Sequence, residues 1–229
     1  MNWLTRLDVD AKTVRAEGIS SDIYAWHKML WECYPDDPDA GRDFLTRIDQ
    51  IEGAFRFWVL AQRKPIRPHW CPSDGFAVNQ ITPSFLTHRY YAFDLRANPV
   101  KTLVQRGLNG ETLFRPNGKR KHGKRVPLVK PDELRAWLVR KGEVRCRDKE
   151  TGLDVPGGFR IVEDKPLEIC PMVESHFRKK GHTGFHGGVQ FRGTLEVTNR
   201  EKFIHTYQSG IGSAKCFGFG LVLLAPVNL

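Results

Sequence analysis

The feature that most constrains the fold of this 229-residue sequence is an order of local patterns that occurs twice. In the first half, residues 2–9 alternate apolar and polar residues as a half-buried strand does, and three further segments are expected to be strands: residues 44–50, 55–62 and 89–97. Ser20 and Ser21 can cap a helix that runs from Asp22 to about Tyr34 and stops before Pro35. A proline-rich loop follows the third strand, and we expect a short helix in it near residues 74–80. The order is strand, helix, two strands, helix, strand.

The second half predicts the same order. We expect helices over residues 131–141, with Pro131 in the first turn, and over 200–209, where Asn199 can cap the start and Gly210 the end. Strands are expected at 158–163, 167–175, 188–198 and 221–227. Two copies of a βαββαβ order predict an α+β protein of two tandem ferredoxin-like (RRM-like) domains, which we assign to residues 1–94 and 95–229.

Charge is distributed unevenly between these halves. The chain has 36 Lys and Arg against 26 Asp and Glu, a net charge of +10. Residues 1–93 hold 11 basic and 12 acidic residues, whereas residues 94–229 hold 25 and 14, and the segment 115–149 alone holds 13 and 4. Such a local excess favours a polyanionic partner, either nucleic acid or an anionic membrane. No basic amphipathic helix accompanies the charge, so we expect nucleic acid and no membrane.

Composition excludes several other classes of protein. Hydrophobic residues make up 40% of the chain and aromatic residues 11%, enough for a buried core. The five cysteines are scattered and form no Cys-x-x-Cys pair, which argues against a disulfide framework or a zinc ribbon. No apolar run reaches the roughly 18 residues of a membrane-spanning helix. Residues 1–18 contain no signal-peptide core, so we expect a cytoplasmic protein with reduced thiols.

Tyr24 and His27 form the first candidate site, within the segment SDIYAWHKMLW. A spacing of three residues places both side chains on one face of a helix, one turn apart. A histidine beside a tyrosine can transfer protons near neutral pH. The alternative is a partly buried aromatic helix whose histidine is only hydrogen-bonded, and the pair alone does not decide between the two.

The segment GIGSAKCFGFG is the second candidate, with Lys215 at its centre and four glycines around it: Gly210, Gly212, Gly218 and Gly220. It matches neither a Walker loop nor a dinucleotide-binding fingerprint. Glycines permit positive φ angles and a close approach of the backbone to a phosphate. The alternative is a tight chain reversal, although four glycines in eleven residues exceed what a reversal needs.

A basic hairpin is the third candidate. Arg178, Lys179 and Lys180 are expected at its tip, where they can grip the phosphates of an RNA stem. A solvated loop is the alternative. Three nearby histidines, at positions 176, 182 and 186, suggest a metal site only weakly, because no helical frame or carboxylate partner supports one.

Taken together, these segments resemble the CasE family, the CRISPR repeat endoribonucleases of the type I-E Cascade complex. The resemblance covers almost the whole chain. It is carried by WLTRL, DIYAWHKMLWECYP, PDAGRDFLTRID, LRANPVKTL, KRVPL, DELRAWLVRK, FRGTLEVTN and GIGSAKCFGFGLVLLAP. The glycine-rich ending and the LRANP segment are its most specific parts.

The resemblance implies a metal-independent endoribonuclease without a cofactor, which binds the repeat hairpin of pre-crRNA and cleaves it at the 3′ base of the stem. It implies His27 as the catalytic residue with Tyr24 as its partner, and other Cascade subunits as partners. The RNA-binding candidates are the basic hairpin, the glycine-rich loop and three further cations: Lys28, Arg96 and Arg160. Two alternatives stay open, a catalytically silent RNA-binding subunit and a metal-dependent nuclease.

Overall fold

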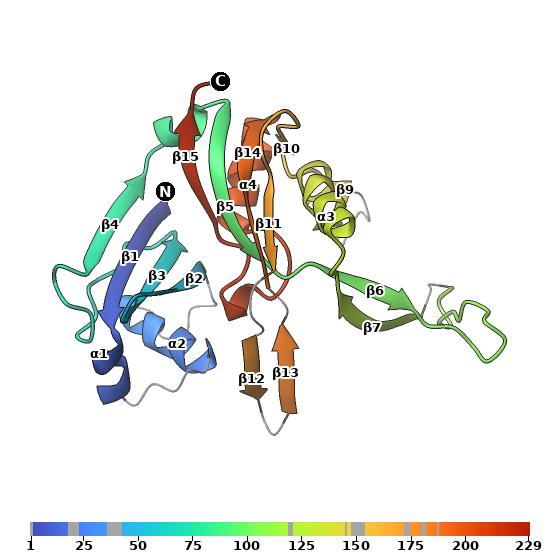
Figure 1. Cartoon of the computed structure of the whole chain (residues 1–229), viewed down its shortest axis with the longest axis horizontal. Coiled ribbons are helices and arrows are strands. Elements are labelled where there is room, and N and C mark those ends of the chain that lie inside the picture. Colours follow the sequence, from blue (N-terminus) through green and yellow to red (C-terminus); the bar gives the residue numbers. More distant parts are fainter. Residues whose placement is uncertain are drawn as a thin grey trace.

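In a computed structural model of the chain, the first half forms a four-stranded antiparallel sheet (Figure 1). The structure describes residues 2–17, 23–35, 43–118, 121–144, 146–147, 154–171, 175–179, 182–186 and 188–229. The strands lie in the order β2-β3-β1-β4, which is the strand order of a ferredoxin-like domain. They are β1 (Asn2–Asp10), β2 (Phe44–Ile51), β3 (Ala54–Ala61) and β4 (Phe76–Ile81).

Two helices and a 3-10 turn connect β1 to β2. They are α1 (Ala11–Ala16), α2 (Ile23–Leu30) and η1 (Trp31–Cys33). The sequence pattern predicted α2 but missed the six-residue α1. The Asp10 carboxylate caps α1 by accepting hydrogen bonds from the backbone N–H groups of Lys12 and Thr13, at 2.8 and 2.7 Å.

The second crossover of this sheet is the connection from β3 to β4, and its described residues contain no helix. The prediction of a short helix near residues 74–80 was wrong. That segment is strand β4, which pairs antiparallel with β1 from Asn2↔Ile81 to Leu7↔Phe76. Backbone pairing with a central strand therefore outweighs local preference here. Pro65, Pro68 and Pro72 precede the strand and disfavour a regular helix in the connection.

The second half repeats the same topology. Its sheet has the order β10-β14-β5-β15, and β11 also pairs with β14. The strands are β5 (Tyr90–Ala97), β10 (Phe159–Ile161), β11 (Glu168–Pro171), β14 (Val189–Val197) and β15 (Val222–Val227). Helices α3 (Pro131–Glu143) and α4 (Arg200–Ser209) form the two crossovers, as predicted. Two ferredoxin-like strand orders in tandem confirm the predicted fold class.

The strand β5 changes the predicted division of the chain. The sequence pattern places most of it at the end of the first domain, but it pairs with β14 along its whole length and with β15 over residues 90–95. A boundary between residues 94 and 95 would cut through this strand. The pairing places the division in the connection before β5, which includes the 3-10 turn η2 (Ser84–Thr87).

Three hairpins and a 3-10 turn extend from the second domain (Figure 1). They are β6 (Val100–Val104) with β7 (His122–Pro127), β8 (Cys146–Arg147) with β9 (Asp154–Val155), β12 (Ser175–Lys179) with β13 (His182–His186), and η3 (Lys215–Phe217). Among the described residues, no helix is both long enough and apolar enough to cross a membrane.

The first sheet buries both of its faces. Alternate residues of a strand point to opposite sides, so Phe57 and Val59 of β3 pack with α1 and α2. Leu60, on the other face, joins a second cluster that continues into the second domain, where it includes Tyr91 and Phe191. Because one apolar cluster includes residues of both domains, burial of apolar surface holds them together.

Buried charge also joins the two sheets. The side chain of Arg47 on β2 is only 4% exposed, and it donates to Asp49 at 2.8 Å and to Asp94 on β5 at 2.8 and 3.2 Å. Asp94 also accepts from Gln190 and Arg192 on β14. Burial is the largest single influence on the pKa of the Asp94 carboxyl and raises it. The charge of Arg47 and the hydrogen bonds from Arg47, Gln190 and Arg192 together outweigh burial and hold this pKa below its usual range.

Candidate active site at the edge of the first sheet

Helix α2 places His27 beside the first residue of strand β2. Trp26 and Leu30 anchor the helix because their side chains are buried in the first core. The half-buried His27 ring stacks on Phe44, with ring centroids 5.3 Å apart and an interplanar angle of 30°. This contact restricts the orientation of the imidazole. Tyr24 lies one turn earlier in the same helix, but its side chain is outside the described residues, so its predicted place beside His27 stays a prediction.

The glycine-rich segment forms a loop that closes on itself. The backbone N–H of Ile211 donates to the Gly220 carbonyl at 2.9 Å, and the N–H of Gly220 donates to the Arg96 carbonyl at 2.7 Å. Gly210 has a φ of +75°, and a Cβ there would lie 2.9 Å from a methyl group of Leu45. Gly220 has a φ of +91°, and its Cβ would lie 2.9 Å from the Ile211 carbonyl oxygen. Glycine is therefore required at both positions for the loop to reach the first domain.

This loop and the histidine helix meet at the edge of the first sheet. The turn η3, in the middle of the loop, contacts both α2 and β2, although the loop belongs to the second domain. Strand β2 is the outer strand of its sheet, so the loop can approach it without disturbing strand pairing. Two of the three motifs that the sequence singled out are thus adjacent in the structure.

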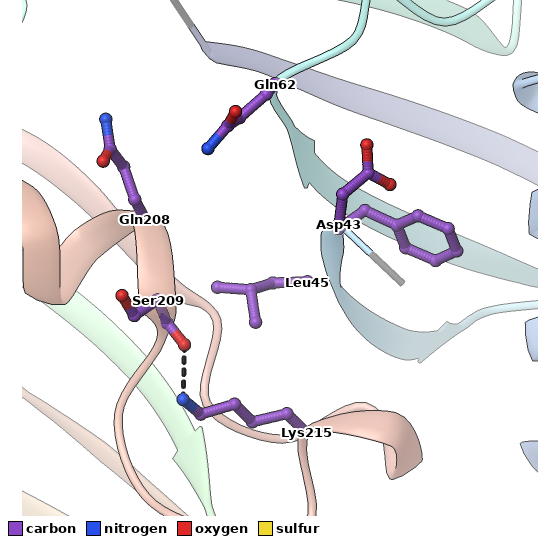
Figure 2. Close-up of a pocket in the computed structure, with 7 residues that line it drawn as sticks. Asp43, Leu45, Gln62, Gln208, Ser209 and Lys215 are labelled. Carbon is purple, nitrogen blue, oxygen red and sulfur yellow. Dashed lines mark hydrogen bonds between the residues drawn. The ribbon is translucent and has the colours of Figure 1, made fainter. Parts of the chain in front are cut away.

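A cleft of about 330 Å³ opens where they meet (Figure 2). The first domain lines it with Asp43, Phe44, Leu45 and Gln62, and the second with Gln208, Ser209 and Lys215. Lys215 donates a hydrogen bond from its ammonium group to the carbonyl oxygen of Ser209. Since Phe44 also stacks on His27, the cleft brings a lysine of one domain close to the aromatic cluster that holds the imidazole of the other.

Gly212 and Gly218 were predicted to contact RNA, but neither of them lines this cleft. Gly212 has a φ of +89°, and a Cβ there would lie 3.2 Å from the Trp137 ring of α3, so it packs within the second domain. Gly218 ends η3 with a φ of +78°, and its Cβ would lie 4.0 Å from the Thr46 carbonyl oxygen of β2. Conformation and packing thus account for both glycines. Of the loop's predicted RNA contacts, Lys215 is the one that lines the cleft, and contact of the glycines with RNA stays a prediction.

The acidic residue of this cleft is paired. Asp43 accepts two hydrogen bonds from Arg63, at 2.7 and 3.0 Å, and these bonds lower the pKa of its carboxyl group. The Arg63 guanidinium lies 4.8 Å from the centre of the Tyr34 ring, and Tyr34 stacks on Phe44. Sequence analysis did not identify Asp43, Gln62 or Gln208 as site residues. Asp43 lies in the segment PDAGRDFLTRID, which gives it no chemical role, and the two glutamines belong to no motif.

The three further cations that were predicted to contact RNA differ in exposure and in their partners. Lys28 is exposed on α2. Arg160 is 66% exposed but shares Glu196 with Arg89, at distances of 2.5 and 2.8 Å. Arg96 is 17% exposed, and it donates to the Ile48 carbonyl and pairs with Asp49 at 2.7 Å, so it joins the two sheets. Burial lowers the pKa of its guanidinium. The geometry of Arg96 favours a role in holding the domains together.

The predicted basic hairpin is confirmed as a pair of strands. Its register runs from Ser175↔His186 to Lys179↔His182, which places Arg178 and Lys179 at the end of the paired segment. The side chains of both residues, and the whole of Lys180, lie outside the described residues. The side chains of the three histidines of this hairpin, at positions 176, 182 and 186, are outside them as well. Among the side chains that are described, no group of three or more His, Cys, Asp or Glu could hold a metal ion.

Comparison with known proteins identifies the family. A family model described as CRISPR associated protein matches residues 2–226. The Cascade subunit CasE of Escherichia coli K12 is 30% identical over 217 residues, which cover 95% of this chain and 98% of that protein. The CRISPR-associated endoribonuclease Cse3 of Thermus thermophilus is 28% identical over 241 residues, covering 98% and 100%.

Solved structures agree over the same length. The crystal structure of Cas6e from E. coli K-12 matches with a TM-score of 0.68 and 25% identity, covering 99% of this chain and 100% of that one. The structure of Thermus thermophilus Cse3 bound to an RNA that represents a pre-cleavage complex matches with a TM-score of 0.65 and 25% identity, covering 98% and 99%. These matches confirm the resemblance that the motifs predicted. The chain belongs to the CRISPR-associated protein family that includes CasE and Cse3.

Proposed function

We propose that this chain is an endoribonuclease that binds the stem-loop of a CRISPR repeat and cleaves pre-crRNA at the 3′ base of the stem. It then stays bound to the product as a Cascade subunit. The observation that carries the proposal is the contact between the glycine-rich loop and the helix that bears His27. Two relatives of this chain support the proposal: one is named a Cascade subunit and the other an endoribonuclease, and a structure of the second bound to RNA has been solved. We expect the protein to act in the cytoplasm.

The chemistry follows from His27 and from the groups that line the neighbouring cleft. The 2′-oxygen of the nucleotide before the scissile bond attacks the phosphorus, and the 5′-oxygen of the next nucleotide leaves. The products are a 2′,3′-cyclic phosphate and a 5′-hydroxyl. This reaction needs one group to accept the proton of the 2′-hydroxyl and one to supply a proton to the leaving oxygen, and an imidazole can do either near neutral pH.

The chain's own side chains provide orientation and charge. Stacking on Phe44 restricts the His27 ring, which reduces the orientational freedom lost in reaching the transition state. Lys215, at the cleft, supplies positive charge against the developing phosphorane. We propose that Tyr24 orients the 2′-hydroxyl or donates a hydrogen bond to the phosphate. None of these steps uses a metal ion.

Cleavage of the repeat hairpin in excess EDTA tests the proposal. Wild-type protein should cut, and His27→Ala should lower the single-turnover rate by about 10²–10⁴-fold, because general acid–base catalysis contributes that much. The matched control is His69→Ala, which removes a histidine that is 68% exposed on the same domain and should leave the rate unchanged.

Each alternative has its own result. Tight binding of the hairpin without cutting by wild-type protein would favour a silent RNA-binding subunit. Cutting that EDTA abolishes would favour a metal-dependent nuclease. A His27→Ala variant that cuts at the wild-type rate in EDTA would remove His27 from the mechanism and leave the activity itself standing.

A further inference from the structure

The hairpin of β6 and β7, residues 100–127, projects from the second domain beside α3, and we call this segment the arm (Figure 1). Its outer part is held by its own backbone hydrogen bonds. The N–H of Leu113 donates to the Gln105 carbonyl at 3.0 Å, and the N–H of Lys121 donates to the Leu113 carbonyl at 2.7 Å. The arm is therefore a folded element beyond its two strands.

Two contacts attach the base of the arm to the body of the second domain. Lys101 pairs with Glu133 of α3 at 2.8 Å, and the N–H of Leu128 donates to the Pro99 carbonyl. Farther out, Leu108 is fully exposed and Phe114 is 59% exposed. These side chains contribute nothing to the core, so the fold of the domain does not explain why the arm is present.

Most of the net charge of the protein lies on the arm. Residues 100–127 hold eight Lys or Arg and one acidic residue, Glu111, so the arm accounts for +7 of the net +10. The Glu111 carboxylate accepts a hydrogen bond from the backbone N–H of Asn109, in the adjacent turn. Such a density of like charge on an element without a core raises the energy of the free protein, and a polyanion would offset it.

Six of these cations are described and exposed. Lys101 pairs with Glu133, and Arg106 donates to the Gly110 carbonyl. The other four are Arg115, Lys121, Lys124 and Arg125. In the part of the chain that the structure describes, no carboxylate forms an ion pair with any of these four.

The strand register shows that the cations of the arm are not all on one side. Directly opposed residues of two paired strands point to the same side of the hairpin. Lys101, which pairs with Glu133 of α3, is opposite Val126, whereas Arg125 is opposite Thr102. Arg125 therefore points to the other side from Lys101. The arm thus presents charge on the side away from α3.

We propose that the arm is a second RNA-binding site, which holds the phosphates of single-stranded RNA outside the hairpin, with Phe114 stacking on a base. Cations combined with an exposed aromatic ring are the usual means of binding single strands. The single sign of the charge favours the RNA backbone over a protein surface. This inference rests on the proposed function for the identity of the RNA, but the charge of the arm does not depend on it.

The test compares two variants of the full-length protein. In the arm variant, Arg115, Lys121, Lys124 and Arg125 are changed to Gln. In the control variant, four exposed cations outside the arm are changed to Gln: Lys12, Arg15, Arg135 and Lys202. Dissociation constants are measured between about 50 and 300 mM KCl for the repeat hairpin alone and for the same hairpin with single-stranded extensions.

The arm variant should bind the extended RNA roughly tenfold or more weakly at moderate salt. The slope of log K against log salt should become shallower by about 2–3, because each phosphate contact on a single strand contributes about 0.7. Binding of the hairpin alone and the single-turnover rate at saturating protein should not change. The control variant should stay within about twofold of wild type on both RNAs. Phe114→Ala should weaken binding of the extended RNA without changing the slope.

Several results would overturn the proposal. Equal losses by the arm and control variants would show that only net charge matters. Equal losses on the two RNAs would place the arm at the hairpin. Wild-type affinity on both RNAs, with loss of assembly into Cascade, would assign the arm to a protein partner. If wild-type protein does not recognise the hairpin at all, the proposed function fails, and binding of oligouridine by the same variants still tests the arm.

Discussion

The two domains of this protein share one strand order but place charge and irregular backbone differently. The first domain replaces its second crossover helix with an irregular connection, and its basic and acidic residues nearly balance. The second domain has both crossover helices, but its connections carry hairpins, and one of these holds +7 of the net charge. The sheets and helices that make the common fold are therefore not what makes the chain basic.

The two domains therefore differ in their proposed roles, one in placing the histidine and the other in carrying most of the cations. Helix α2 and strand β2 of the first domain place the histidine, and the loop of the second domain reaches to them across the domain boundary. The cations that fit a polyanion lie mainly on extensions of the second domain, which can differ in length and charge without changing either sheet. A variant that separates the domains should impair the cleft, whereas a variant of the extensions should leave it intact.

The largest effect should come from the buried ion pairs between the domains. Arg47→Ala leaves Asp94 and Asp49 without their most buried partner, and removing one member of a buried pair costs about 3–5 kcal/mol. We expect a fall in the free energy of unfolding of about 3 kcal/mol, measured by urea denaturation.

Arg56→Ala is the matched control, because Arg56 pairs with Asp8 at 2.7 Å within the first sheet and is 33% exposed. Its loss should cost under about 1 kcal/mol. If the two variants lost the same stability, the pairs between the domains would be no more important than an ordinary surface pair.

A smaller effect on stability, but a specific effect on activity, is expected at Gly220. A Cβ at this position would come within 2.9 Å of the Ile211 carbonyl oxygen, in addition to the strain of its positive φ. Gly220→Ala should therefore shift the loop, destabilise the protein by about 1–3 kcal/mol and slow single-turnover cleavage. Gly53→Ala is the control, because Gly53 has a φ of +68° in the β2–β3 turn and open space around it. Equal cleavage rates for the two variants would contradict a role for the loop in the site.

Local patterns predicted most of the fold, because the elements that they identified carry their own signals. Helix α4 is an example: the side chain of Asn199 accepts from the Lys202 N–H at 3.0 Å, and Gly210 ends the helix with a positive φ. The errors arose where tertiary pairing decides. Nothing within FAVNQI shows that it pairs with β1, and nothing within RYYAFDLRA shows to which sheet it belongs.

The candidate site was predicted only in part, for the same reason. His27 and Lys215 lie in motifs and could be identified. Gln62 and Gln208 reach the cleft only because two domains meet there, and single amide residues leave no pattern in a sequence. Arg96 shows a different limit: a cation in a specific motif was assigned to RNA, which stays a prediction, and its guanidinium contacts the Ile48 carbonyl and Asp49. The sequence alone does not show whether a basic side chain contacts groups within the protein or a separate molecule.

The cysteines of the two domains are expected to differ in their rate of alkylation. Cys33 and Cys71 of the first domain are buried, whereas Cys170 and Cys216 of the second are exposed. Burial raises the pKa of the Cys33 thiol to about 12 and that of Cys71 to about 11. Since the thiolate is the reactive form, iodoacetamide at a pH of about 8 should alkylate the two exposed cysteines about a hundredfold faster or more, as measured by peptide mapping.

The same shifts predict how stability depends on pH. Below the ordinary thiol pKa, near about 8.5, both thiols are protonated whether the chain is folded or not. Above it, the unfolded chain loses these protons while the folded protein keeps them, so the free energy of unfolding falls as the pH rises from about 8.5 toward 11. A variant with Cys33→Ala and Cys71→Ala should lose less stability than wild type between about pH 8 and pH 9.5. An equal loss in both proteins would assign the alkaline effect to other groups, and rapid alkylation of Cys33 would show that the first core opens.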